Sequence, residues 1–84
     1  MDELWLALAS EVVRQDKIHP AGYPATRDGV FAGIQTAIHE LHSEHEAMGA
    51  WQDEKRHGVW TNTRAELLQA AAVIVRTVRS IDTA

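Results

Sequence analysis

The stretch that decides the fold is residues 66–81, ELLQAAAVIVRTVRSI. Its apolar side chains recur at alternating intervals of four and three residues, at Leu67, Ala71, Ile74, Val78 and Ile81. That spacing places them on one face of an α-helix, and Leu68 and Val75 widen the face. The pattern predicts a helix that packs in a bundle.

Two interruptions divide the rest of the chain. Residues 18–27 contain two prolines and a glycine and exclude a regular helix. At residues 58–61, a glycine follows three basic residues, which is typical of a helix end. We therefore expect one all-α domain over residues 1–84, with helices at 2–17, 28–57 and 61–81.

The three predicted helices differ in length, and this predicts self-association. The middle helix would be about 45 Å long at the α-helical rise, longer than either neighbour. Gly49 could break it and shorten the exposed part; otherwise a second copy covers its apolar face. A chain of 84 residues without cysteine has a small core and no disulfide to support it. We expect a three-helix protomer that forms a four-helix-type bundle as a homodimer or higher homo-oligomer.

Net charge and hydrophobic pattern limit the kinds of partner and the cellular compartment that we expect. The net charge of −4 argues against a dedicated binder of nucleic-acid polymers, which normally carries a basic surface. No apolar run approaches the roughly 20 residues of a membrane span, and the N-terminus does not have the pattern of a signal segment. We expect a cytoplasmic protein with no membrane partner.

Several polar residues interrupt or flank the apolar faces. Two lie one turn apart on each of the first two helices, and two lie three residues apart on the third: Glu11 and Gln15, Glu40 and Glu44, Glu66 and Gln69. A buried carboxylate is costly unless it is paired or bound to metal. Carboxylates from several helices form metal sites in helical bundles, and oxygen ligands suit Mg²⁺ or Mn²⁺.

Each of these residues also has a structural interpretation. The two glutamates of the middle helix can edge a solvated face. Thr63 and Glu66 have the spacing of a capping box, unless the helix begins at Thr61. Glu11 can pair with Arg14, and Gln15 can lie at the surface.

Three histidines of the middle helix form an alternative candidate metal site. His39, His42 and His45 are three residues apart and can hold Zn²⁺ or Ni²⁺, lie at the surface or pair with neighbouring glutamates. His39 and Glu40 begin like the zinc-protease motif HExxH, but Ser43 stands where the second histidine is required.

The order of these segments resembles a known family. EVVRQDK at residues 11–17 is followed by a Pro/Gly loop, a Glu-rich helix and ELLQAAAVIV at residues 66–75. This resembles the MazG-like branch of the all-alpha nucleoside triphosphate pyrophosphatases, especially the short forms of phages and actinobacteria. Glu40 and Glu44 match the outer residues of its Glu-Glu-x-x-Glu pattern, and Leu41 replaces the middle glutamate.

The resemblance implies a metal-dependent hydrolase that converts a nucleoside triphosphate to the monophosphate and pyrophosphate. Its implied catalytic residues and metal ligands are Glu40, Glu44 and Glu66, with Gln69 as a further ligand where many members have Asp. His45 or Glu46 could replace the ligand lost at Leu41. The cofactor would be Mg²⁺, with Mn²⁺ as a substitute.

Candidate substrate contacts lie on the first and middle helices. Arg14 and Lys17 are candidate phosphate cations, Gln15 lies between them, and Trp51 or Trp60 can stack on a base. Lys55 and Arg56 instead compensate the dipole of a helix C-terminus. The alternative function is a catalytically silent helical module of the same type that binds a protein or a nucleotide.

Overall fold

The computed structural model describes residues 2–42 and 47–84, and the part described is all-helical. Its helices are α1 (Glu3–Ile18), α2 (Arg27–His42), α3 (Ala47–His57) and α4 (Thr61–Asp82). The prediction of an all-α fold is confirmed, and the predicted first and last helices agree with α1 and α4 to within a residue. The prediction of one helix over residues 28–57 is wrong, because the structure divides this stretch between α2 and α3.

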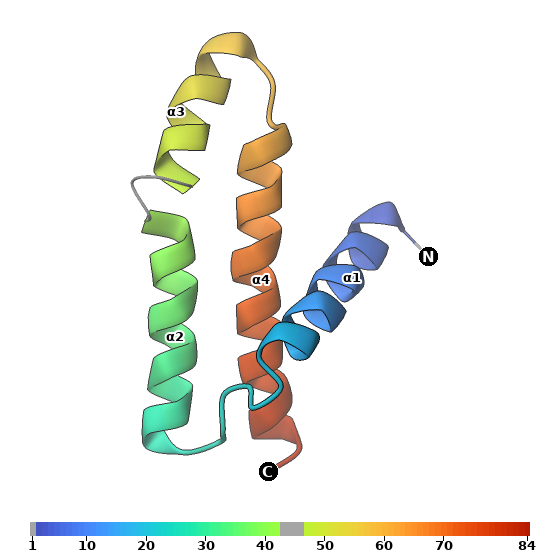
Figure 1. Ribbon diagram of the computed structural model, residues 1–84, viewed down its shortest axis with the longest axis vertical. Helices are drawn as coiled ribbons and strands as arrows, with labels where there is room; N and C mark the ends of the chain where they lie inside the picture. The colour runs from blue at the N-terminus through green and yellow to red at the C-terminus, as the bar shows by residue number, and fades with distance from the viewer. Residues whose placement is uncertain (1, 43–46) are drawn as a thin grey trace.

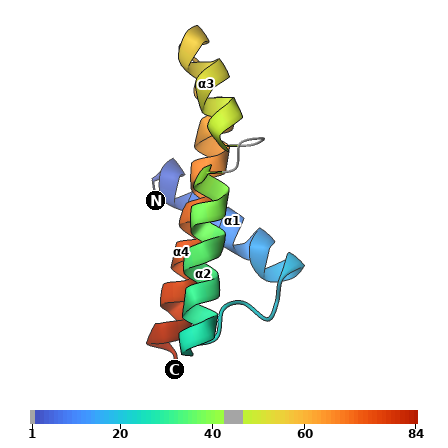
Figure 2. The ribbon, with the colours of Figure 1, turned by 90° about the vertical axis from the view of Figure 1, so that its left-hand side faces the viewer.

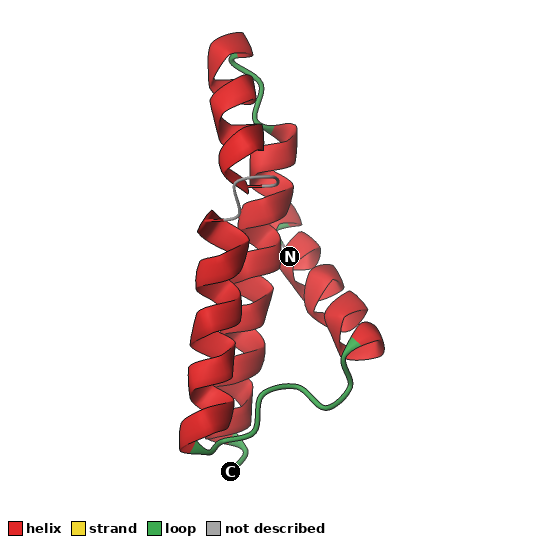
Figure 3. Ribbon diagram, turned by 60° about the vertical axis from the view of Figure 1, so that its left-hand side comes forward, coloured by secondary structure: helices red, strands yellow, loops and turns green. Residues whose placement is uncertain are grey.

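The helix α4 is the centre of the arrangement and contacts the other three helices. Figure 1 shows α2 antiparallel to α4, with α3 beyond the end of α2. In Figure 1 the C-terminal end of α1 lies beside α4 and its N-terminal half leads away from the other helices. Figure 3 shows the loop that runs from the end of α1 to the start of α2. Viewed from the side of α2, the helices α2 and α4 overlap along most of the length of α2 (Figure 2). None of the described helices is both long and apolar enough to cross a membrane.

Small residues form the contact between α2 and α4. Gly33 and Ala37 are one turn apart on α2, and Ala70, Val73 and Thr77 follow at intervals of three and four on α4; all are buried. A Cβ atom at Gly33 would overlap the Thr77 side chain, so the two backbones approach closely there only because the residue is glycine. The buried apolar residues of the described chain are three alanines and one valine.

The large apolar residues of the predicted α4 stripe are half exposed. Leu67, Ile74, Val78 and Ile81, together with Ile34 of α2, retain between 48% and 53% of their surface. The sequence pattern identified a genuine apolar stripe, but this stripe does not form the close contact between α2 and α4. Close packing of α2 against α4 uses the small residues beside that stripe and leaves the stripe facing outward.

The junction between α3 and α4 is closed by a carboxylate. Gly58 has a φ of 66°, a left-handed conformation suited to the end of α3. Glu54 accepts hydrogen bonds from the backbone N–H groups of Asn62 (2.9 Å) and Thr63 (2.6 Å) and from the Thr63 hydroxyl (2.8 Å). The capping-box interpretation is therefore wrong: α4 begins at Thr61, and its free N–H groups bind a side chain of α3.

A buried arginine fixes the end of α1 on α4. Arg76 is 1% exposed, and its Nε donates to Asp16 at 2.9 Å. Arg79 also donates to both oxygens of Asp16, at 2.7 and 3.0 Å, and its hydrogen bond holds the pKa of that carboxyl below its ordinary value. Arg76 further donates to the His19 carbonyl and lies over the ring of Tyr23, so the loop after α1 is held as well.

Candidate functional site

A polar cleft of about 120 Å³ lies where α1, α2 and α4 meet, beside the loop that follows α1. It contains four of the site residues predicted from the sequence. The residues that line it are Arg14, Gln15, Ile18, His19, Tyr23, Thr36, Glu40, Gln69, Val73 and Arg76. The cleft therefore gathers side chains that are up to about sixty positions apart in the chain.

Gln15 is the most deeply buried contribution of α1. It is 7% exposed, so the interpretation of this residue as a surface amide is wrong. Its Nε2 donates to Glu11 Oε2 at 2.8 Å and to the Gln69 carbonyl at 3.0 Å. Its Oε1 is shielded from solvent and accepts no hydrogen bond within the described residues. The burial of Gln15 thus leaves its side-chain oxygen without a donor among the described residues.

Arg14 brings a positive charge to the rim of the cleft. It binds Glu11 through two hydrogen bonds of 2.7 and 2.8 Å, which confirms the predicted pairing. This hydrogen bonding raises the pKa of Arg14 and lowers that of Glu11. The negative charge of Glu40 adds a smaller increase in the pKa of Arg14, so the arginine also interacts electrostatically with a residue of α2.

The half-buried Glu40 is the carboxylate that lines the cleft. Its Oε2 is shielded from solvent and has no hydrogen-bond donor among residues 2–42 and 47–84. Thr36, one turn earlier, donates its hydroxyl to the Ala32 carbonyl at 2.8 Å. The interpretation of Glu40 as part of a solvated face does not fit this burial.

The remaining predicted metal ligands have different positions. Gln69 lines the cleft, and Glu66 lies three residues earlier on α4, half-buried and with its Oε2 shielded from solvent. Glu66 is not among the residues that line the cleft. Glu44 and the possible substitutes His45 and Glu46 lie outside the described residues, as does the side chain of His42.

Two predicted substrate residues lie away from the cleft. Lys17 is exposed near the end of α1. Trp51 is on α3, where it lines a separate surface depression with Gln52, Lys55 and Arg56. The Lys55 ammonium lies 4.8 Å from the centre of the Trp51 ring, so this tryptophan is engaged by a cation of its own helix.

Arg76 was not predicted from the sequence, although a signal for it was present. The residue lies within the apolar run of residues 70–78, where a charge requires a buried partner. That partner, Asp16, is sixty residues away, and sequence spacing could not identify it. His19, Tyr23 and Thr36 were also missed, because each enters the cleft only through the packing of the loop and α2 against α4.

The residues of the cleft suit a cation bound by a few oxygen atoms. They do not form a site of three carboxylates or histidines. Within the described ranges, no group of three or more His, Asp or Glu side chains is placed to hold a metal ion. Gln15 and Glu40, each with one shielded oxygen that has no donor among the described residues, nevertheless line one cleft together with Gln69. Mg²⁺ commonly binds through one or two carboxylates, retains several waters and takes further ligands from phosphates.

Comparison of the chain with protein-family models, with curated proteins and with solved structures gives no match.

Proposed function

We propose that this protein is a metal-dependent nucleoside triphosphate pyrophosphohydrolase of the MazG-like type. The observation that carries the proposal is the cleft itself. Arg14 and Gln15, Glu40, and Gln69 come from three different helices and line one small polar space. The sequence predicts Glu40 and Gln69 as metal ligands and Arg14 and Gln15 as substrate contacts, so the cleft gathers residues of both kinds.

The chain's own residues would divide the work as follows. Glu40 and Gln69 would hold Mg²⁺ or Mn²⁺, with Glu66 close by on α4 and Glu44 as the further carboxylate that the resemblance implies. The cation, when bound, supplies the charge that holds the triphosphate and favours attack by water on the phosphoanhydride. Arg14, at the rim, would exchange Glu11 for a phosphate oxygen pair, which a guanidinium binds bidentately. Buried Arg76 holds the floor of the cleft in place through Asp16 and the His19 carbonyl.

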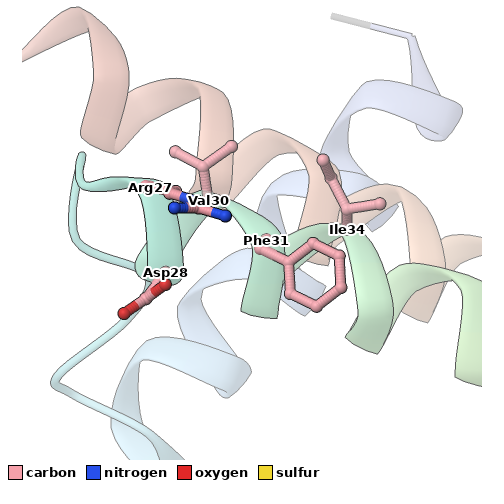
Figure 4. Close-up of a pocket in the computed structure, with 5 residues that line it drawn as sticks. All are labelled: Arg27, Asp28, Val30, Phe31 and Ile34. Atoms are coloured by element: carbon pink, nitrogen blue, oxygen red, sulfur yellow. The ribbon is translucent and has the colours of Figure 1, made fainter.

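The proposal includes a homodimer, which the exposed apolar face supports. A wholly apolar depression of about 230 Å³ lies between α2 and α4 and is lined by Val30, Gly33, Ile34, Ile74, Thr77, Val78 and Ile81. A second depression at the start of α2 continues it through Val30 and Ile34 and adds Phe31, which is 59% exposed. Figure 4 shows Val30, Phe31 and Ile34 projecting from α2, with Arg27 and Asp28 at its start.

A second copy of the chain fits this face. Two antiparallel α2–α4 pairs packed face to face form a four-helix bundle, and the large side chains then fill its centre. Each protomer on its own buries only alanine and valine among its apolar residues, within the part of the chain described. Since small domains need additional apolar burial to be stable, we expect the folded species to be the dimer.

Release of pyrophosphate tests the proposed activity. Nucleoside triphosphates are screened with and without millimolar Mg²⁺ or Mn²⁺, and we expect release that requires the cation. Glu40→Gln should lower the rate at least about 100-fold, because one charge of the cation site is lost. Glu3→Gln, at an exposed glutamate of α1, is the matched control and should retain the parental rate.

A folded dimer that releases no pyrophosphate from any nucleoside triphosphate, with either cation, would contradict the proposal. The chain would then be a catalytically silent helical module of the same fold, and binding of nucleotides or proteins would be the next property to measure.

A further inference from the structure

The orientation of the Gln15 amide is determined by its neighbours. The two atoms within hydrogen-bond distance of Nε2 are a carboxylate oxygen of Glu11 and the carbonyl oxygen of Gln69. Both can only accept, so the NH₂ group must face them and Oε1 must face the other way. Gln15 is only 7% exposed, and its Oε1 accepts no hydrogen bond from the described residues. A buried amide oxygen left in this state costs free energy unless something else binds it.

Three of the residues that line the cleft donate hydrogen bonds to other groups. Arg14 donates to Glu11, and the Thr36 hydroxyl donates to Ala32. Arg76 donates to Asp16 and to the His19 carbonyl. Glu40, which lines the same cleft, also has a shielded oxygen, Oε2, without a donor among the described residues. Two lining residues with an unpartnered oxygen each, one of them a carboxylate, suit a cation that prefers oxygen ligands.

We propose that Gln15 is an oxygen ligand of the divalent cation that Glu40 holds, so that α1 is part of the metal site. This rests on the cation of the proposed function but does not depend on hydrolysis. The sequence assigned Gln15 to the substrate; the orientation of its amide assigns it to the cation instead. With one carboxylate and one or two amide oxygens from the described chain, the site leaves several coordination positions to water and to phosphates.

Binding of Mn²⁺ to the nucleotide-free protein tests this inference, with electron paramagnetic resonance as the readout of free and bound ion. Gln15→Met removes the oxygen while preserving side-chain length, and we expect it to weaken Mn²⁺ binding at least about 10-fold. Gln35→Met makes the same change at an exposed position of α2 and should alter the dissociation constant less than about twofold.

A second pair of variants separates ligation from a general effect of charge. Gln15→Glu adds a charged oxygen at the proposed ligand position and should tighten Mn²⁺ binding. Arg14→Met changes the local charge by the same unit without adding an oxygen. Ligation requires that Gln15→Glu tighten binding more than Arg14→Met does. If Gln15→Met does not fold, this second comparison decides the matter.

The outcomes distinguish the inference from the proposed function. Unchanged Mn²⁺ affinity in Gln15→Met, with cation-dependent pyrophosphate release intact, would overturn the inference alone. Weakened Mn²⁺ binding in a protein that releases no pyrophosphate would support the inference and overturn the enzymatic proposal. Absence of Mn²⁺ binding by the parent would overturn the inference and remove the cation from the proposed function.

Discussion

The two sides of α4 contrast sharply in side-chain size and in burial. On the side that faces α2 and α1, the buried residues are Ala70, Ala72, Val73, Arg76 and Thr77. On the other side, Leu67, Ile74, Val78 and Ile81 are each about half exposed. One side thus makes the close contacts of the protomer with little apolar area, while the other carries the large apolar area and makes few contacts. The protomer is held by close backbone approach and a few polar links, and the large side chains remain available for the proposed second copy.

The largest effect is expected from a charge on the buried side. Ala70 is 1% exposed, and Ala70→Glu would place an unpaired carboxylate between α4 and its neighbours. An unpaired buried charge costs several kcal/mol, against a total stability of about 5–15 kcal/mol for a small domain. We expect loss of most helical signal in far-ultraviolet circular dichroism. Ala84→Glu, at the exposed C-terminus, is the control and should leave the spectrum unchanged. A cooperative melt for Ala70→Glu at the parental temperature would show that the small-residue side is not the core.

A charge on the exposed side should act on association first. The sequence pattern alone predicts unfolding for Ile74→Glu, but Ile74 is half exposed in the protomer, so the new carboxylate remains hydrated there. We expect dissociation of the dimer, measured by sedimentation at low micromolar concentration, with a smaller loss of helicity than for Ala70→Glu.

Val13→Glu is the matched control for association, because Val13 is exposed on α1, outside the apolar depressions of α2 and α4. It should leave the sedimentation coefficient unchanged. A parent that already sediments as a stable, folded monomer would remove the basis for the proposed dimer.

The smallest expected effect concerns Glu54 and depends on pH. Burial raises the pKa of Glu54, but hydrogen bonds from the Asn62 and Thr63 N–H groups and from the Thr63 hydroxyl outweigh it and hold the pKa below its ordinary value of 4.5. A carboxyl whose folded pKa is depressed stabilises the fold above its unfolded pKa, and this contribution is lost as the pH falls through the folded value.

Melts of Glu54→Gln at several pH values test the cap. The variant should melt below the parent near neutral pH, and the difference should shrink below about pH 4.5, as the parent's carboxyl takes up a proton. Asp53→Asn, one residue earlier and exposed, should not reproduce this pH dependence. An equal difference between parent and Glu54→Gln at pH 7 and pH 3 would show that the charge of Glu54 does not stabilise the start of α4.

Local signals in the sequence were sufficient for most helix boundaries. Asp2 accepts a hydrogen bond from the Leu4 N–H at the start of α1, and Gly58 ends α3 with a positive φ. Capping side chains, prolines and glycines act within a few residues of their own position, which is why such boundaries can be predicted from sequence. Gly49 was a possible break of the predicted helix over residues 28–57, but it lies within α3 (Ala47–His57).

The candidate site was predicted in part, for a similar reason. Polar residues at helical spacing within apolar faces identified Gln15, Glu40 and Gln69, all of which line the cleft. The same reasoning could not place Trp51, which lies on a different helix from the cleft and at a separate depression. Spacing shows which side of one helix a residue occupies, but not which sides of two helices meet.

The sequence by itself thus determined that the chain is helical, where α1 and α4 begin and end, and that α4 carries one broad apolar stripe. Only the tertiary structure decided that this stripe lies half exposed beside the contact with α2 rather than within it. Hydrophobic periodicity detects large apolar side chains. The contact between α2 and α4 instead depends on how closely the two backbones approach, and the residues at that point, Gly33 and Thr77, add almost nothing to a hydrophobic pattern. Only the tertiary structure also decided the pairs Asp16–Arg76 and Gln15–Gln69, because residues more than fifty positions apart meet through packing alone.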